Sequence, residues 1–383
     1  MTRSARPRAR DLGIEIGLGQ PGPLNAITDV AGVRVGCVTI IEGDGPLVVG
    51  QGPVRTGVTV IVPRDEEISE HPLFAGCHRL NGNGELTGLE WVRESGLLTS
   101  PIALTNSHSV GVVRDALVRR EIEARGPGKL FWSLPVVGET WDGCLNDING
   151  QHVRAEHVFA ACAHASDGPV PEGNVGGGTG MICHDFKGGT GTASRVVETD
   201  GERFAVGVLV QANHGERPQF QVNGVLVGQI LDDAAVPIPA LPEEGAAARG
   251  AGSIIGVVAT DAPLLPGQLQ RLAQRAGLGV ARLGAYAGNY SGDLFLAFST
   301  ANRDLPAMNY GSGGPVRVPL EMLSLCHIDP LLEAVVEATA EAILNAMLAA
   351  ETMVGRDGVT AHALDGAALT VALDRYGRRV FRS

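Results

Sequence analysis

The sequence has no Cys-x-x-Cys pair and no His-x-x-x-His pair, although it contains six cysteines and ten histidines. The cysteines are scattered at positions 37, 77, 144, 162, 183 and 326. This pattern is typical of reduced thiols and indicates neither a disulfide framework nor a zinc site. We therefore predict a cytoplasmic protein that uses no metal and no cofactor.

Positive charge and long apolar runs are also scarce. The 30 Lys and Arg residues against 42 Asp and Glu give a net charge of −12, which excludes a nucleic-acid partner because phosphate binding needs clustered cations. Four arginines at positions 3, 6, 8 and 10 lie in segment 1–12, which we predict to be a flexible tail. No apolar run reaches the ~18 residues of a membrane span, so no membrane partner is predicted. No apolar stretch typical of a signal peptide follows the basic start.

Glycine and apolar residues are abundant. The 53 glycines are about twice the usual share of roughly 7%, and the 44% of hydrophobic residues support a large core. Predicted strands and helices occur in clusters and do not strictly alternate, which disfavours a doubly wound parallel sheet. We predict an α+β chain, one domain over residues 1–383, with two sheets packed face to face and helices outside.

The predicted elements follow from apolar periodicity. Runs of β-branched and apolar residues predict strands over 33–41, 57–62, 189–198, 204–212, 219–227, 253–260, 279–285 and 293–300. Helical spacing predicts helices over 85–94, 110–123, 152–164, 266–277 and 329–353. The linker 235–252 lies between strands that we expect to share one sheet.

The junction Gly252-Ser253 is the strongest candidate for chemistry. A run rich in Pro, Gly and Ala (241–252) stops at a serine that leads a buried-type strand. Cleavage before Ser253 would give it an α-amine of pKa about 7.7–8.0, which can act as the base for its own hydroxyl. Gly252 tolerates the backbone strain that cleavage requires. The alternative is an ordinary loop that enters a strand, with Ser253 as an edge residue.

Four other polar residues are candidates for the same site. Asn213 lies just past the end of a predicted strand and is a candidate oxyanion donor, or else a turn-forming residue. Glu139 follows an apolar run and would bind a substrate ammonium, or else lie in a solvated loop. Ser291 and Asp293 are two apart at a strand start and so face one side, where they orient a proton or cap a turn.

The glycine-rich stretch 176–180 lacks the Gly-Lys-Ser/Thr ending of a phosphate loop. It favours close backbone approach at an active-site wall over nucleotide binding. His108 and His214 are weaker site candidates, because a structural role is more typical of an isolated histidine.

Several runs, taken in order, closely resemble the family of L-aminopeptidase/D-esterase and β-peptidyl aminopeptidase enzymes. They are residues 138–143, 145–148, 210–213 and 252–255 continuing to 259–264, within a similarity from 27–36 to 291–302. The resemblance implies a four-layer αββα sandwich, similar to N-terminal nucleophile hydrolases but with different connectivity. It also implies a precursor cut into chains of 252 and 131 residues that form a homo-oligomer of αβ heterodimers.

The resemblance also assigns roles to residues. It implies Ser253 as the nucleophile, Asn213 as the oxyanion-hole asparagine, Glu139 as the carboxylate for the substrate amine, and Ser291 and Asp293 as residues that assist the nucleophile. Trp141 stands where we expect the family to carry a tyrosine in the substrate site. An indole donates but does not accept a hydrogen bond, so this chain lacks the phenolic acceptor there.

These observations together predict a metal-free, self-processing serine aminopeptidase. It would hydrolyse N-terminal aminoacyl amides, esters and short peptides (L-α, D-ester or β-aminoacyl) through an acyl-enzyme on Ser253. One alternative is an acyltransferase like the ornithine acetyltransferases, although those use threonine. The other is an uncleaved small-molecule-binding protein that uses residues 176–180.

Overall fold

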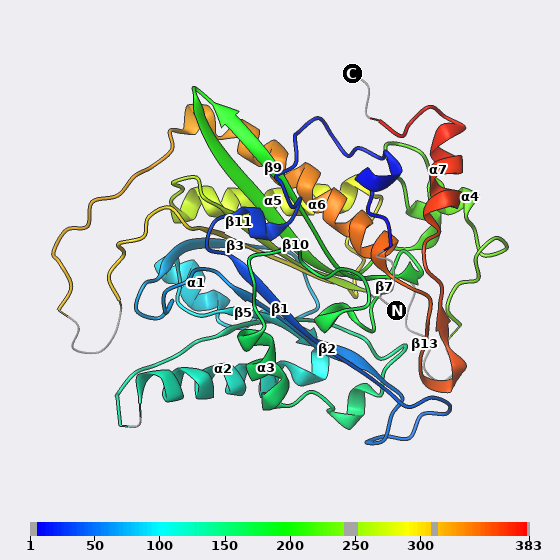
Figure 1. Ribbon diagram of the computed structural model, residues 1–383, viewed down its shortest axis with the longest axis horizontal. Coiled ribbons are helices and arrows are strands. Elements are labelled where there is room, and N and C mark those ends of the chain that lie inside the picture. Colours follow the sequence, from blue (N-terminus) through cyan, green and yellow to red (C-terminus); the bar gives the residue numbers. More distant parts are fainter. Residues whose placement is uncertain (1–5, 127, 241–251, 308–312, 381–383) are drawn as a thin grey trace.

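The computed structural model describes residues 6–126, 128–240, 252–307 and 313–380. Two β-sheets are stacked between layers of helices (Figure 1). The four-stranded sheet has the order β1 (Arg34–Glu42), β2 (Val54–Val62), β5 (Ile102–Asn106), β6 (Val136–Thr140). The six-stranded sheet has the order β4 (Leu97–Leu98), β3 (Leu73–Gly82), β12 (Gly292–Ser299), β11 (Ser253–Thr260), β10 (Glu202–Asn213), β9 (Gly189–Thr199).

Each sheet carries helices on its outer face. Helices α5 (Pro266–Arg282) and α6 (Asp329–Ala349) pack on the six-stranded sheet, and α2 (Val110–Arg125) and α3 (Ala155–Ala163) pack on the four-stranded one. The predicted α+β fold with four αββα layers is therefore confirmed. None of the helices in the described ranges is long and apolar enough to cross a membrane.

Shorter elements complete the chain. They are the helices α1 (Leu89–Ser95), α4 (Val227–Ile230) and α7 (Gly366–Asp374), the ribbon of β7 (Ile182–Cys183) with β8 (Phe186–Lys187), and the ribbon of β13 (Met353–Val354) with β14 (Thr360–Ala361). Single 3-10 turns lie at Arg10–Leu12, Ile27–Asp29, Ser107–Ser109, Ile148–Gly150, Gly176–Gly178, Arg217–Gln219, Leu325–His327 and Arg356–Gly358.

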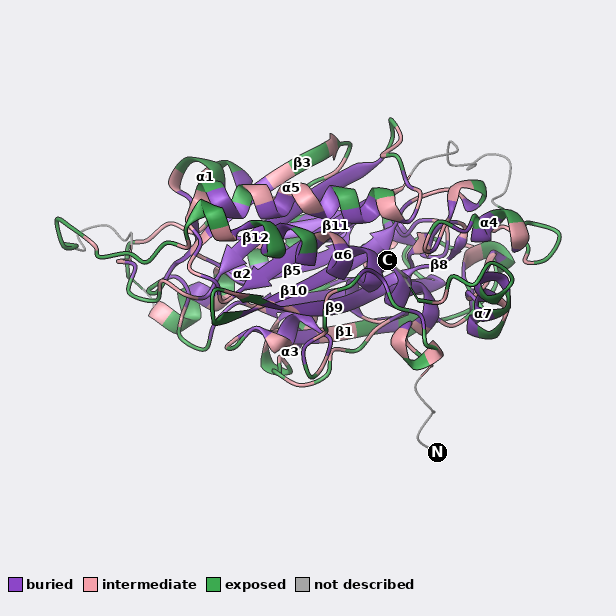
Figure 2. Cartoon of the chain, turned by 90° about the horizontal axis from the view of Figure 1, so that it is seen from above, coloured by how far each residue is buried: buried purple, intermediate pink, exposed green. Residues whose placement is uncertain are grey.

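The apolar core follows these layers. One cluster of buried side chains fills the space between α5, α6 and the six-stranded sheet, a second lies between the sheets, and a third lies under α2 and α3. Successive residues of a strand serve different clusters, because their side chains point to opposite faces. Phe295 of β12 packs toward α5 and α6, whereas Leu296 packs between the sheets. The strands are accordingly buried along most of their length (Figure 2).

Two predicted strands are wrong. The strand over 279–285 does not form, because α5 continues to Arg282. Gly279 does not stop the helix but lets it approach α6, since a Cβ there would lie 2.6 Å from the Cβ of Thr339. The strand over 219–227 is reduced to a bridge between Val222 and Val225 around a tight turn, followed by α4.

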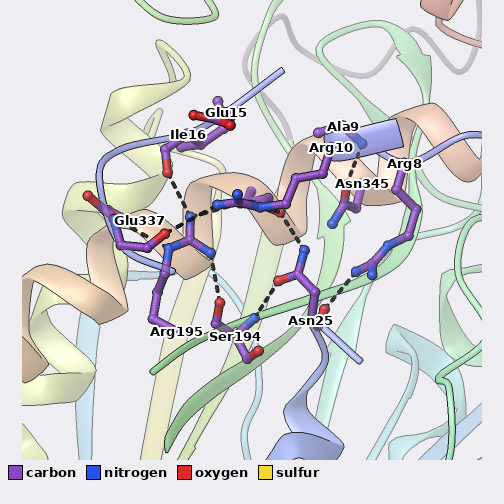
Figure 3. A network of polar contacts seen from close by, with 12 residues as sticks. Arg8, Ala9, Arg10, Glu15, Ile16, Asn25, Ser194, Arg195, Glu337 and Asn345 are labelled. Carbon is purple, nitrogen blue, oxygen red and sulfur yellow. Dashed lines mark hydrogen bonds and ion pairs between the residues drawn. The ribbon is translucent and has the colours of Figure 1, made fainter. Parts of the chain in front are cut away.

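The flexible tail predicted over 1–12 is wrong for residues 6–12. Arg8 donates to the backbone oxygens of Leu24, Asn25 and Thr192, and Arg10 binds Glu341 of α6. Figure 3 shows this network, in which Arg195 of β9 lies at the centre. Arg6, Arg8 and Arg10 are therefore paired with acceptors of the folded chain, whereas residues 1–5 of the predicted tail lie outside the described residues.

Candidate active site

Ser253 begins β11 at an interior position of the six-stranded sheet. Its Cα is paired with Asn213, the last residue of β10, on one side, and with Gly292, the first residue of β12, on the other. Of the predicted linker 235–252, residues 241–251 lie outside the described residues. Gly252 is held so closely that a Cβ would lie 2.5 Å from the backbone oxygen of Asn213. The reading of Ser253 as an edge residue is wrong.

One backbone donor reaches both sides of the Gly252–Ser253 junction. The N–H of Gly292 lies 3.3 Å from the carbonyl oxygen of Gly252 and 3.1 Å from Oγ of Ser253. Ser253 itself is buried, with 6% of its surface exposed. The hydroxyl and the carbonyl of the preceding peptide bond are thus held beside one polarising group.

Ser291 and Asp293 form a hydrogen-bonded pair next to this donor. Oγ of Ser291 donates to Oδ1 of Asp293 at 2.7 Å, so the prediction that both face one side is confirmed. The Oδ2 atom of Asp293 is buried without a hydrogen-bond partner among the described residues. Burial raises the pKa of Asp293 to about 6, although the bond from Ser291 opposes the shift. The pair can therefore accept or orient a proton near neutral pH.

The side chain of Asn213 is held at both ends. Its Oδ1 accepts the N–H of Ile182 at 2.8 Å, and its Nδ2 donates to the backbone oxygen of Trp141 at 3.0 Å. An amide nitrogen carries two hydrogens, so one remains for a ligand. Asn213 lies in a strand, and its reading as a turn residue is wrong. Trp141 positions this amide with its carbonyl, while its indole is 37% exposed.

Glu139 lies on β6 and is buried, so its reading as a solvated loop residue is wrong. Its carboxylate accepts the N–H of Glu85 at 2.8 Å and the hydroxyl of Ser107. Burial raises the pKa of Glu139, and these two hydrogen bonds partly offset the shift. Gly84 connects this carboxylate to the junction: a Cβ there would lie 3.0 Å from Oε1 of Glu139 and 3.1 Å from Cα of Gly292.

Gln211 links the two sheets beside the site. This residue of β10 donates from Nε2 to the backbone oxygen of Thr105 and to Oγ1 of Thr140, both at 2.8 Å. Thr140 follows Glu139 on β6, and Gln211 is two residues before Asn213. The bridge therefore fixes the distance between the candidate amine site and the candidate oxyanion donor.

The glycine-rich stretch lies against this bridge. Gly176–Gly178 form a 3-10 turn on β2, and a Cβ on Gly177 would lie 2.0 Å from Oε1 of Gln211. The prediction of close backbone approach is confirmed. His108, the other weak candidate, is exposed, and its charge lowers the pKa of nearby Glu139.

Sequence reasoning missed two buried ionisable side chains near the site, those of Lys187 and Asp142. The Nζ of Lys187 donates to the backbone oxygens of Met181 and Gly188, and burial lowers its pKa to about 7. Burial also raises the pKa of Asp142 to about 7, although hydrogen bonds from Thr56, Asn146 and Asn106 oppose the shift.

His214 lies in a cluster that the sequence did not indicate. One ligand atom each from Cys183, His184 and His214 lies within 4.8 Å of the others, and all three residues are buried. All six cysteines of the chain are free thiols. The Cys-x-x-Cys and His-x-x-x-His patterns detect only ligands that are close together in the sequence. This cluster instead joins the β7–β8 ribbon to the end of β10, which are distant in the sequence.

Comparison with known proteins gives one consistent result. The model of peptidase family S58 matches residues 25–361. The beta-peptidyl aminopeptidase BapA of Sphingosinicella microcystinivorans is 50% identical over 377 residues, which cover 97% of this chain and 93% of the relative. The enzyme of the same name from Sphingosinicella xenopeptidilytica is 46% identical, covering 94% of this chain and 89% of the relative.

Solved structures agree with the sequence relatives. A Burkholderia sp. beta-aminopeptidase matches with a TM-score of 0.89 and 53% identity over 98% of this chain and 100% of the other. The L-aminopeptidase D-Ala-esterase/amidase of Ochrobactrum anthropi matches with a TM-score of 0.88 and 44% identity, over 98% and 100% of the two chains. The latter is described as a prototype of the serine aminopeptidases and a variant of the Ntn hydrolase fold.

Proposed function

The chain belongs to peptidase family S58, and on that premise we propose that it is a self-processing aminopeptidase whose nucleophile is Ser253. Aminopeptidase activity follows from the family and sets aside the acyltransferase and binding-protein alternatives. The observation that carries the proposal is the N–H of Gly292, which reaches both Oγ of Ser253 and the carbonyl oxygen of Gly252.

Processing breaks the peptide bond between Gly252 and Ser253. Oγ of Ser253 attacks the carbonyl carbon of Gly252, and the N–H of Gly292 stabilises the negative charge that develops on the carbonyl oxygen. The proton of the hydroxyl passes to the departing nitrogen, which leaves an ester between the two residues. Water then hydrolyses this ester to give a carboxylate on Gly252 and a free α-amine on Ser253.

The new terminus carries out aminopeptidase turnover. The α-amine of Ser253 takes the hydroxyl proton while Oγ attacks the substrate carbonyl. The free N–H of Asn213 and the N–H of Gly292 bind the oxyanion, and the leaving amine receives the proton from the α-ammonium. Water then releases the acyl group from Ser253. Ser291 and Asp293 orient protons beside the α-amine. No step requires a metal ion at the reacting atoms.

Glu139 binds the ammonium group of the substrate. Its two oxygens each accept one hydrogen bond from the protein, which holds the carboxylate in place and leaves lone pairs for the ligand. Gly84 separates it from Gly292, so a bound ammonium lies close to the carbonyl that Ser253 attacks. This placement restricts the enzyme to the first residue of a chain.

We expect the substrates to be short. The relatives at 50% and 46% identity are called beta-peptidyl aminopeptidases, and a third is called an L-aminopeptidase D-Ala-esterase/amidase. The substrate class proposed for this chain is therefore N-terminal β-aminoacyl amides and short peptides, together with L-α-aminoacyl amides and D-configured esters. The partly exposed indole of Trp141 lies at the edge of this site and contacts the substrate by its apolar face.

Intact mass and a substrate panel test the proposal together. Purified protein should show two chains of 252 and 131 residues, and should release amine from β-alanyl, L-alanyl and D-alanyl p-nitroanilides or esters. A single uncut chain with full activity would overturn the proposed mechanism. Activity restricted to internal peptide bonds would overturn the role of Glu139.

We also propose that αβ heterodimers assemble into a homo-oligomer. Residues 313–328, which precede α6, extend away from the layers (Figure 1) and expose the apolar side chains of Val316, Leu320, Met322 and Leu325. Apolar patches of this kind mark protein–protein contacts. Light scattering should give a multiple of the αβ mass, and a Leu320→Asp, Met322→Asp variant should reduce it. A wild-type mass of one αβ pair at micromolar concentration would contradict assembly.

A further inference from the structure

The buried cluster of Cys183, His184 and His214 has the chemistry of a metal-binding site. A thiol and two imidazoles are the ligands that zinc prefers in proteins. Sγ of Cys183 lies 3.9 Å from Nδ1 of His214. One tetrahedral zinc with bonds of about 2.3 Å to sulfur and 2.0–2.1 Å to nitrogen separates two such ligands by about 3.6 Å, so small side-chain rotations bring the ligands into place.

The two imidazoles leave nitrogen atoms without partners. Nε2 of His184 and Nε2 of His214 are buried and accept or donate no hydrogen bond within the described part of the chain. A buried polar atom without a partner is costly and calls for an explanation. An ion bound to Nε2 of His184 would remove this cost for that ring, whereas His214 would bind through Nδ1, which faces the thiol of Cys183.

Contacts with the surrounding protein fix the orientation of the His184 ring, as is usual for a histidine that binds a structural metal. His184 packs against the ring of Phe220, and its Nδ1 lies 3.3 Å from the backbone oxygen of Glu216. Metal-bound histidines commonly make such a contact with their second nitrogen, which fixes the ring orientation. Gly215 is pressed against His184, since a Cβ there would lie 2.4 Å from Cε1.

We propose that Cys183, His184 and His214 bind one zinc ion at the end of β10. The ion would be a positioning element and not a reactant, because it would join the two segments that hold Asn213. Ile182 of β7 donates to the side chain of Asn213, and the N–H of His184 donates to the backbone oxygen of His214. A metal across these segments would lock the candidate oxyanion donor next to Ser253.

Cobalt substitution tests the site directly. Apoprotein prepared with a chelator is titrated with Co²⁺, which gives a thiolate-to-cobalt absorption band only when a cysteine is a ligand. We expect the band to saturate at one Co²⁺ per chain, to disappear on addition of one equivalent of Zn²⁺, and to be accompanied by a higher Tm. The Ser253→Ala variant should bind equally, so failure of the proposed processing leaves this result unaffected.

Variants separate this cluster from other thiols. Cys183→Ser should abolish the band, and His214→Phe, which keeps an apolar ring, should weaken binding by at least about tenfold. The matched control is Cys77→Ser with His78→Ala, an adjacent Cys-His pair in β3 outside the cluster, which should bind like wild type.

Three results would overturn the proposal. They are absence of a stoichiometric band in the wild type, a band that persists in Cys183→Ser, and a band lost in the Cys77 and His78 control. If Cys183→Ser does not fold, the wild type and His214→Phe still decide the question. Water that fills the site without metal would appear as the first of these results.

Discussion

Two buried polar clusters of this protein differ in how completely they are paired. Around Arg195, the guanidinium donates to Glu337, to Glu341 and to the backbone oxygens of Ile16 and Ser194. At the start of β11, by contrast, buried polar atoms of Asp293, His184, His214 and Gln211 have no hydrogen-bond partner in the described ranges.

The difference distinguishes a cluster that stabilises the fold from a cluster whose groups are available for chemistry. A saturated network in a low-dielectric interior fixes the chain in one arrangement, and here it joins the N-terminal segment to β9 and α6 (Figure 3). Unsatisfied buried groups are expected where a ligand, proton or ion completes the site. Substitutions around Arg195 should therefore change stability, and substitutions around Ser253 should change activity.

The strongest test of this comparison is Ser253→Ala. Without the hydroxyl the chain should stay uncut and activity should fall by at least about 10⁴-fold. The fold should be kept, because only one oxygen is lost. Intact mass, turnover and circular dichroism measure the three quantities. A Ser253→Ala chain that still splits before residue 253 would contradict the mechanism.

Arg195→Met tests the opposite region. Removal of the guanidinium leaves Glu337 and Glu341 buried with less compensation, so unfolding should become easier by about 3–5 kcal/mol. Processing and turnover of the folded protein should stay close to wild type. Asp374→Asn, in the exposed pair with Arg379, should show no measurable change in urea denaturation. A large loss of turnover in folded Arg195→Met would show that the Arg195 cluster also affects activity, which contradicts the division between a stabilising region and a catalytic one.

Asn213→Asp removes a donor and keeps the oxygen that accepts the N–H of Ile182. We expect kcat to fall by about 10²–10³-fold with little change in KM, because an oxyanion donor acts in the transition state. The new carboxylate oxygen faces the backbone oxygen of Trp141 with no donor between them, so unfolding should also become easier by about 1–3 kcal/mol. Steady-state kinetics on an aminoacyl p-nitroanilide measure this, with Asn302→Asp as a surface control. A change confined to KM would place Asn213 in substrate binding instead.

The smallest effect concerns pH. Below the α-amine pKa of about 7.7–8.0, kcat/KM should fall about tenfold per pH unit. The pKa of Asp293 is raised to about 6, so below that pH the slope should approach about a hundredfold per unit. Asp293→Asn should restore the shallower slope at a lower overall rate. A profile with the same slopes in both proteins would remove Asp293 from proton transfer.

The same group affects stability with a definite sign. The folded protein keeps the proton of Asp293 to higher pH than the unfolded chain, whose pKa is near 3.8. The free energy of unfolding should therefore fall as pH rises from about 4 to about 6 and stay lower above it. The difference between wild type and Asp293→Asn in urea denaturation isolates this contribution.

The sequence predicted those parts of the fold in which a residue pattern acts locally. The strands that became β1, β2, β9, β10, β11 and β12 contain runs of β-branched or apolar residues, and α2, α3 and α6 show helical spacing. It missed β3, a strand next to β12, because Gly76 interrupts the apolar pattern. That glycine is needed because a Cβ would lie 2.3 Å from the backbone nitrogen of Gln270 in α5.

Prediction of the candidate site was limited in the same way, because local patterns reveal only some of its residues. Ser253, Asn213, Ser291, Asp293 and Glu139 were found because each begins or ends a predicted strand or lies in a recognisable run. Other contributors depend on contacts between segments that are far apart in the chain. They are Gly292 with its N–H, Gly84 between the carboxylate and the junction, Gln211 between the sheets, and the partners of His214.

The interior position of β11 has a consequence for refolding. Its first residue lies between β10 and β12, and β10 belongs to the segment before the proposed cut while β11 and β12 belong to the segment after it. Once the bond before Ser253 is broken, the sheet is assembled from two molecules. Folding of the precursor is a first-order reaction, whereas recovery of the processed enzyme after denaturation requires a bimolecular encounter and depends on concentration. The proposed processing would therefore make loss of structure effectively irreversible in dilute solution.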